Sequence, residues 1–184
     1  SKRLMWEAPG AWHALMEKLA EVVSRYLKAQ IKAGAQAVQV FDSWVGSLAP
    51  DDYEEFVLPY SRHVMESLKD QGVPVIHFAN NASTLLELVR RAGGDVIGID
   101  WRINLDEAWR RVGYDVAIQG NLDPIALLAP PDVIEDKVKG ILARAAGRPG
   151  HIFNLGHGIN KETPVEHAIA LVEAVHKHSR STGV

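Results

Sequence analysis

The chain has 184 residues and a mass of 20.2 kDa, which allows about one domain. Hydrophobic residues make up 47% and charged residues 23%, which is ordinary for a globular protein and excludes disordered or collagen-like chains. The net charge of −3 leaves no basic footprint for nucleic acid or an anionic membrane, and the absence of cysteine excludes disulfide scaffolds and thiolate sites.

Stretches with the hydrophobic pattern of a helix alternate along the chain with stretches that have the pattern of a buried strand. Apolar residues recur at helical spacing in several stretches, and short apolar runs of strand length separate them. Pro59 is expected to kink the second helix, and Ser83 is expected to be the N-cap of the third. The predicted helices are residues 10–33, 51–71, 83–92, 104–112, 131–146 and 164–178. The predicted strands are residues 37–41, 73–78, 95–99, 115–118 and 151–153.

Short apolar strands that are each followed by a helix indicate an α/β fold with a parallel sheet. A doubly wound sheet and a (β/α)8 barrel both fit, but no G-x-G-x-x-G or P-loop sequence supports the first. The polar side chains gather where the strands end, which is where barrels assemble their active sites. A closed barrel needs eight strands and about 250 residues. We therefore expect a partial TIM-type barrel of about five βα units.

Those strand ends allow two further kinds of site. Ser43 with His157 as base and Asp100 or Asp123 as orienter would make a hydrolase triad, although Ser43 lacks the G-x-S-x-G context. His77 and Asp42 with Asp100 and His157 would offer metal ligands, although no H-x-H or H-E-x-x-H pair is present. The alternatives are a ligand-binding Ser43, a buried and hydrogen-bonded His77, and an Asp100 that caps its loop.

Two other segments are dense in candidate binding groups. Residues 119–124 are either a turn into the next helix or a ligand-facing loop. In the segment around His157, Gly156 and Gly158 allow close backbone approach and an exposed imidazole, which favours a functional role. Trp44 and Trp101 follow acidic or hydroxyl residues at strand ends, where they could line a flat ligand or pack in the core.

Several motifs follow one another along the chain: Phe41-Asp42-Ser43-Trp44, Pro50-x-x-Tyr53-x-x-Phe56-x-x-Pro59-Tyr60, Val73-Pro74-Val75-Ile76-His77-Phe78, Gly98-Ile99-Asp100-Trp101, Gln119-Gly120-Asn121-Leu122-Asp123-Pro124 and Asn154-Leu155-Gly156-His157-Gly158-Ile159. In order and spacing, over nearly all of the chain, they resemble the uroporphyrinogen decarboxylase family.

The resemblance implies a (β/α)8 barrel that acts as a cytoplasmic homodimer in tetrapyrrole (heme) biosynthesis. Such a lyase decarboxylates the four acetate arms of uroporphyrinogen III to give coproporphyrinogen III, without cofactor or metal. Ser43 and His157 match the family's substrate-binding Ser and His, while Trp101, Gln119 and Asn121 are expected cleft residues. No nucleic acid or membrane partner is expected.

The family's N-terminal arginines, aspartate and tyrosine have no counterpart here. Residues 1–184 are therefore expected to be the C-terminal part of one barrel domain, cut inside the barrel at Ser1 and inactive alone. They would associate with the missing half or with a second copy. Asn80-Asn81 and Arg102 depart from the family pattern and put substrate geometry in doubt.

Two other functions stay open from the sequence. A zinc-dependent methyltransferase of the same fold would need a His-x-Cys motif, whereas this chain has His77-Phe78-Ala79 and no cysteine. A non-catalytic fragment or binding module is the second alternative.

Overall fold

The structure is a computed structural model that describes residues 2–179. Within them, five strands alternate with helices and keep their chain order, β1-β2-β3-β4-β5. A doubly wound sheet would reverse this order partway, whereas a barrel would not. The α/β fold of a partial barrel is therefore confirmed. The chain forms two compact units that divide between Ile97 and Gly98, and each is described by itself.

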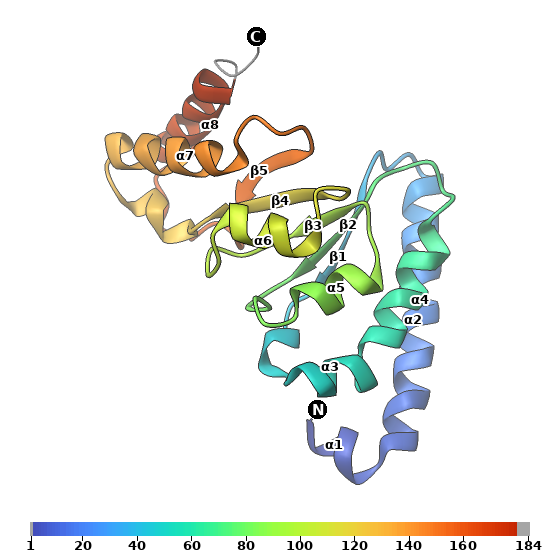
Figure 1. The fold of residues 1–184 in the computed structure, drawn as a ribbon. Coiled ribbons are helices and arrows are strands. Elements are labelled where there is room, and N and C mark those ends of the chain that lie inside the picture. The colour runs from blue at the N-terminus through green and yellow to red at the C-terminus, as the bar shows by residue number, and fades with distance from the viewer. Residues whose placement is uncertain (1, 180–184) are drawn as a thin grey trace. The chain divides into compact units, whose positions relative to one another are not determined.

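The first unit pairs strands through parallel ladders and covers them with helices (Figure 1). Val38 lies opposite Val75 and Asp42 opposite Ala79, so β1 and β2 end at the same level. The elements of this unit are α1 (Lys2–Glu7), α2 (Pro9–Lys32), β1 (Val38–Asp42), η1 (Val45–Ser47), α3 (Pro50–Phe56), α4 (Leu58–Leu68), β2 (Val75–Ala79), α5 (Leu86–Ala92) and the start of β3 (Val96–Gly98).

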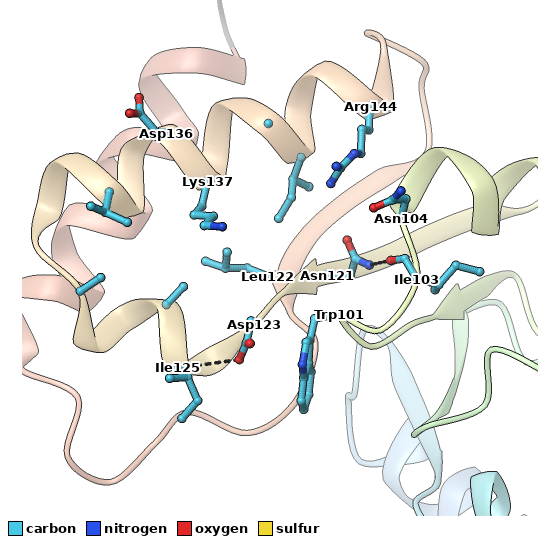
Figure 2. Close-up of a pocket in the computed structure, with 15 residues that line it drawn as sticks. Trp101, Ile103, Asn104, Asn121, Leu122, Asp123, Ile125, Asp136, Lys137 and Arg144 are labelled. Carbon is cyan, nitrogen blue, oxygen red and sulfur yellow. Dashed lines mark hydrogen bonds between the residues drawn. The ribbon is translucent and has the colours of Figure 1, made fainter.

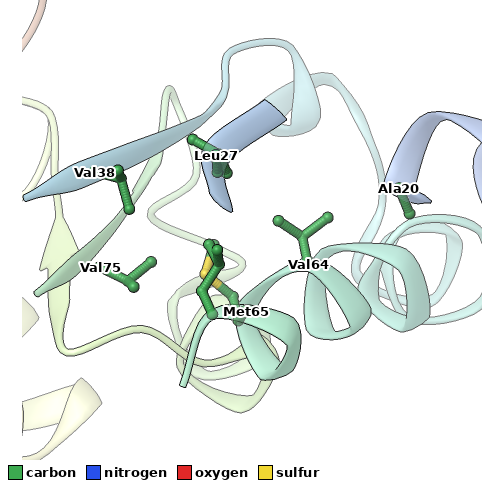
Figure 3. Packing of buried hydrophobic residues seen from close by; sticks show 7 residues of the cluster. Ala20, Leu27, Val38, Val64, Met65 and Val75 are labelled. Carbon is green, nitrogen blue, oxygen red and sulfur yellow. The ribbon is translucent and has the colours of Figure 1, made fainter. Parts of the chain in front are cut away.

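The core of the first unit lies where α2 and α4 pack on the two strands (Figure 3). Its seven members are apolar and at most 5% exposed. Burying such side chains contributes about 1.5–3 kcal/mol each to folding. They are Ala20, Leu27, Val38, Val64, Met65, Leu68 and Val75.

The second unit repeats the arrangement with β4 and β5 in a parallel ladder. Ile118 lies opposite His151 and Leu122 opposite Leu155, and α7 and α8 lie side by side (Figure 1). Its elements are α6 (Leu105–Val112), β4 (Ala117–Leu122), η2 (Pro124–Leu128), α7 (Pro131–Ala145), β5 (His151–Leu155) and α8 (Val165–Ser179). Among residues 2–179, no helix combines the length and apolar character needed to cross a bilayer.

Two predicted helix boundaries were wrong. The expected kinked helix over residues 51–71 is two helices, α3 and α4, because the backbone breaks at Val57 (φ −129°) just before Pro59 in the first turn of α4. Proline fits there because its missing N–H is not needed in a first turn. Ser83 is not an N-cap, since α5 begins at Leu86 after a turn in which Leu85 N donates to Ala82 O (2.8 Å).

His151 at the start of β5 is expected to make stability depend on pH. Its Nε2 lies 2.9 Å from Gly120 O, and burial lowers the pKa of His151 while the Gly120 carbonyl opposes that shift. The unfolded chain therefore takes up a proton at about pH 6.5 that the folded chain resists, so the free energy of unfolding falls as the pH drops below that value. Urea unfolding at about pH 7 and about pH 5.5 measures the loss. His151→Gln should remove part of it, and an identical pH dependence in the variant would contradict the assignment.

Candidate functional site

A buried polar cluster lies where β1 and β2 end in the first unit. His77 Nε2 lies 2.7 Å from Asp42 Oδ2, and its Nδ1 lies 3.3 Å from Gly93 O. The Ser61 hydroxyl on α4 donates to the same Asp42 oxygen (3.0 Å). The His77 side chain is fully buried, and that of Asp42 is 17% exposed. His77 is thus a hydrogen-bonded interior residue, which was the alternative to a metal ligand.

Tyr53 on α3 completes this cluster. Its side chain is fully buried beside Asp42 and Ser61. Burial, and to a smaller extent the Asp42 charge, raises the pKa of the Tyr53 hydroxyl above its ordinary value. Tyr53 therefore stays protonated at neutral pH and is a potential donor next to a carboxylate.

Ser43 directly follows the Asp42 cluster on a turn between β1 and η1. It is exposed, and the neighbouring Trp44 is 86% exposed, so Trp44 is not a core residue of the first unit. At Gly46 this turn packs closely against the backbone of the segment after β2. A Cβ at Gly46 would lie 2.6 Å from Asn80 O and would overlap the Asn81 carbonyl. The backbone of Asn80-Asn81 therefore packs against the turn that carries Ser43 and helps to hold it in place.

In the second unit, the corner after β3 is held by a charge pair. Asp100 is 3% exposed and accepts from the Arg102 backbone N–H (2.9 Å) and from its guanidinium (2.9 Å). The same guanidinium lies 4.1 Å over the Trp101 ring, a cation–π contact. Asp100 thus caps its loop, as one alternative predicted, and Arg102 places a positive charge on an aromatic face.

The residues of β4 that were expected in a cleft are mainly buried. Gln119 is 6% and Asn121 is 5% exposed. The Asn121 amide donates to Asp100 O (2.9 Å) and Ile103 O (2.7 Å), so it fastens the corner after β3. Gly120 has a φ of 143°, and a Cβ there would lie 2.7 Å from Ile99 O. Glycine is therefore required at this close approach.

His157 stands on an exposed turn after β5. Gly156 anchors that turn, because its N–H donates to Leu122 O (2.7 Å) and a Cβ would lie 2.7 Å from Trp101 N. The predicted close backbone approach is confirmed for Gly156, whereas Gly158 has no atom within 4 Å of its Cβ position. His157 and Trp101 are thereby brought to neighbouring turns of the second unit.

A pocket of about 610 Å³ opens beside this corner, between the end of β4, η2 and α7 (Figure 2). Trp101 and Asn121 line it, but His157 and Gln119 do not. Two cations of α7, Lys137 and Arg144, also line it, and sequence reasoning missed both. Their seven-residue spacing, with Gly140 between them, would have placed them on one helix face.

The hydrolase and metal hypotheses gain no support. Asp100 is paired with Arg102, and Asp123 Oδ1 accepts from Ile125 N (2.9 Å), so both supposed orienters have other partners. Among residues 2–179, no group of three or more histidines and carboxylates is placed to hold a metal ion. Tyr53 and Ser61 were also missed as site residues, since a tyrosine and a serine at helical spacing do not reveal a shared carboxylate partner.

Solved structures place the fold in a known class of α/β proteins. A methyltransferase from Methanosarcina mazei superposes with a TM-score of 0.75 over 86% of this chain and 47% of that one. At 22% identity this likeness shows the fold alone.

Sequence comparison gives the family. The family profile described as uroporphyrinogen decarboxylase matches residues 1–178, and the chain belongs to that family. Uroporphyrinogen decarboxylase from Carboxydothermus hydrogenoformans is 69% identical over 178 residues, which are 97% of this chain and 51% of the relative. That from Sorangium cellulosum is 58% identical over 99% of this chain and 52% of the relative. The chain thus spans about half the length of these curated relatives.

Proposed function

We propose that this chain is the C-terminal part of a barrel that decarboxylates the four acetate arms of uroporphyrinogen III to give coproporphyrinogen III. The observation that carries the proposal is the 69% identity to a uroporphyrinogen decarboxylase across 97% of the chain. The exposed positions of Ser43, directly after β1, and of His157, two residues after β5, support it. A cytoplasmic homodimer and association with a further half of the barrel are part of the same proposal.

For this reaction the protein has mainly to position the substrate and to stabilise the charge that develops on it. Protonation of a pyrrole ring carbon makes the ring an electron sink, so the C–C bond to the acetate carboxylate can break, releasing carbon dioxide and leaving its electron pair in an exocyclic methylene. A proton delivered to that methylene carbon gives the methyl group, and loss of the ring proton restores the pyrrole. In this proposal the Ser43 hydroxyl and the His157 imidazole hold substrate carboxylates in place. Preorganised donors of this kind stabilise charge as it develops, which is usually a large part of catalysis.

The methyltransferase alternative has less support. The structural neighbour carries that name, but the likeness extends to the fold alone. No cysteine is present to supply a thiolate to zinc, and His77 is fully committed to Asp42 and the interior. The other alternative, a non-catalytic fragment, predicts no decarboxylation in the chimera experiment that follows.

The test inserts this chain in place of the matching segment of the Carboxydothermus enzyme. We expect the chimera to convert uroporphyrinogen III to coproporphyrinogen III, while the 184-residue chain alone converts little. In the chimera, His157→Ala should lower kcat/KM by about tenfold or more, because a substrate-binding donor is lost. His176→Ala, which removes another exposed histidine of the second unit, is the matched control. An inactive but folded chimera, or an unchanged kcat/KM for His157→Ala, would overturn the proposal.

A further inference from the structure

Two cations of α7, Lys137 and Arg144, line the pocket of the second unit. Lys137 makes no hydrogen bond or ion pair within residues 2–179. Arg144 forms a loose ion pair with Asp106 (Nε to Oδ1, 3.8 Å), at a distance too long for a hydrogen bond. Figure 2 shows both side chains directed into the pocket from α7, whereas Asp136 points away from it. Within residues 2–179, Lys137 and Arg144 therefore keep N–H donors that are not used in hydrogen bonds.

Two acidic residues, Asp123 and Asp136, also line the pocket, and each has a hydrogen-bond partner of its own. One oxygen of Asp123 is occupied by the Ile125 N–H, which it caps at 2.9 Å. Asp136 pairs instead with Lys139 (3.1 Å) on the outer face of α7. The two carboxylates balance the formal charge of Lys137 and Arg144, so the pocket offers localised cationic donors on α7 rather than a net positive charge.

Apart from the amides of Asn104 and Asn121, the remaining walls are apolar, with an aromatic ring at one end. The floor is Leu122 at the end of β4, and η2 and α7 contribute aliphatic side chains. Trp101 is fixed there by the Arg102 guanidinium on its ring and by the close packing of Gly156 against its backbone. The volume of about 610 Å³ lies within the range of small-molecule sites. A ligand with an apolar body and anionic ends would contact the apolar lining with its body and the two cations with its ends.

We propose that this pocket binds an amphiphilic carboxylate, with its apolar body against Trp101 and Leu122 and its carboxylates on Lys137 and Arg144. The two cations are seven residues apart on α7, or about 10 Å along the helix axis, so a ligand with two separated carboxylates fits best. Either an alkyl dicarboxylate or the edge of a carboxylated tetrapyrrole has this chemistry. The site is separate from His157 and does not depend on the proposed decarboxylation.

The probe is azelate, an alkyl dicarboxylate, titrated into the 184-residue chain by calorimetry with tryptophan fluorescence in parallel. We expect saturable binding that Lys137→Ala and Arg144→Ala each weaken about five-fold and that the double variant weakens further, as lost ionic contacts predict. Trp101→Phe should abolish the fluorescence change but keep most of the affinity. Lys139→Ala is the matched control, because this cation lies on the same helix and pairs with Asp136 and Glu135.

Three outcomes would overturn the proposal in a chain whose circular dichroism is unchanged. They are the absence of saturable azelate binding, equal binding of the uncharged dimethyl azelate, and equal losses for Lys139→Ala and Lys137→Ala. A competition with uroporphyrin assigns the source of the carboxylates. If uroporphyrin displaces azelate from the unchanged chain but not from the double variant, the pocket binds a tetrapyrrole. If uroporphyrin does not displace azelate, the pocket binds an alkyl carboxylate.

Discussion

Replacing Trp109 by alanine is expected to lower the free energy of unfolding by about 4 kcal/mol. Trp109 on α6 is 1% exposed, and its indole N–H donates to Val116 O (2.9 Å). Its ring packs near Tyr114 and His151, with centroids 5.8 and 6.4 Å away. Alanine would leave a cavity in the second unit and an unsatisfied buried carbonyl at the entry to β4. Urea unfolding followed by far-ultraviolet circular dichroism measures the loss.

Trp109→Phe separates the two contributions. Phenylalanine keeps most of the ring volume but cannot donate to Val116 O, so we expect a loss of about 1–2 kcal/mol. Trp6→Ala is the matched control, because Trp6 on α1 is 61% exposed and should change stability little. Equal effects of Trp109→Ala and Trp6→Ala would contradict the packing described for the second unit.

Much of the fold could be predicted because buried parallel strands have a strong local pattern. The runs around Val75 and Val96 are continuous, apolar and bounded by glycine or proline, so their strands were found to within a few residues. β4 was predicted to end at Ile118 but continues to Leu122. Gln119, Gly120 and Asn121 look like a turn in sequence, and only the pairing with β5 shows that they are strand.

The candidate site was less accessible to sequence reasoning, because its contacts join residues that are far apart in the chain. The exposed turn of His157 followed from its flanking glycines. Asp42 and His77 were grouped from the sequence only as metal ligands. Their direct hydrogen bond and the contact with Ser61 did not follow, since the three residues lie on different elements. The helix face that carries Lys137 and Arg144 was also missed, because exposed cations on a helix usually face solvent alone.

The Asp42 cluster is the feature of the first unit whose disruption should cost most. Asp42→Ala is expected to lower the free energy of unfolding by about 3 kcal/mol, because it removes the acceptor shared by His77 and Ser61 and leaves a fully buried imidazole nitrogen without its partner. The backbone of Ser43 directly follows this anchor, so its turn should also loosen. Hydrogen exchange of the amides of residues 43–47 reports that loosening separately from global unfolding.

Two variants show whether the charge or the hydrogen bonds matter. Asp42→Asn keeps the size and one acceptor oxygen, and it should recover more than half of the loss if hydrogen bonding dominates. Ser61→Ala removes one donor and leaves the His77 contact in place, so its cost should stay near 1 kcal/mol. In a double-mutant cycle, Asp42→Ala and His77→Ala should be strongly non-additive, since each already breaks the same 2.7 Å contact. Additive losses would mean that the two side chains do not stabilise each other, and the cluster would then have no role in holding the Ser43 turn.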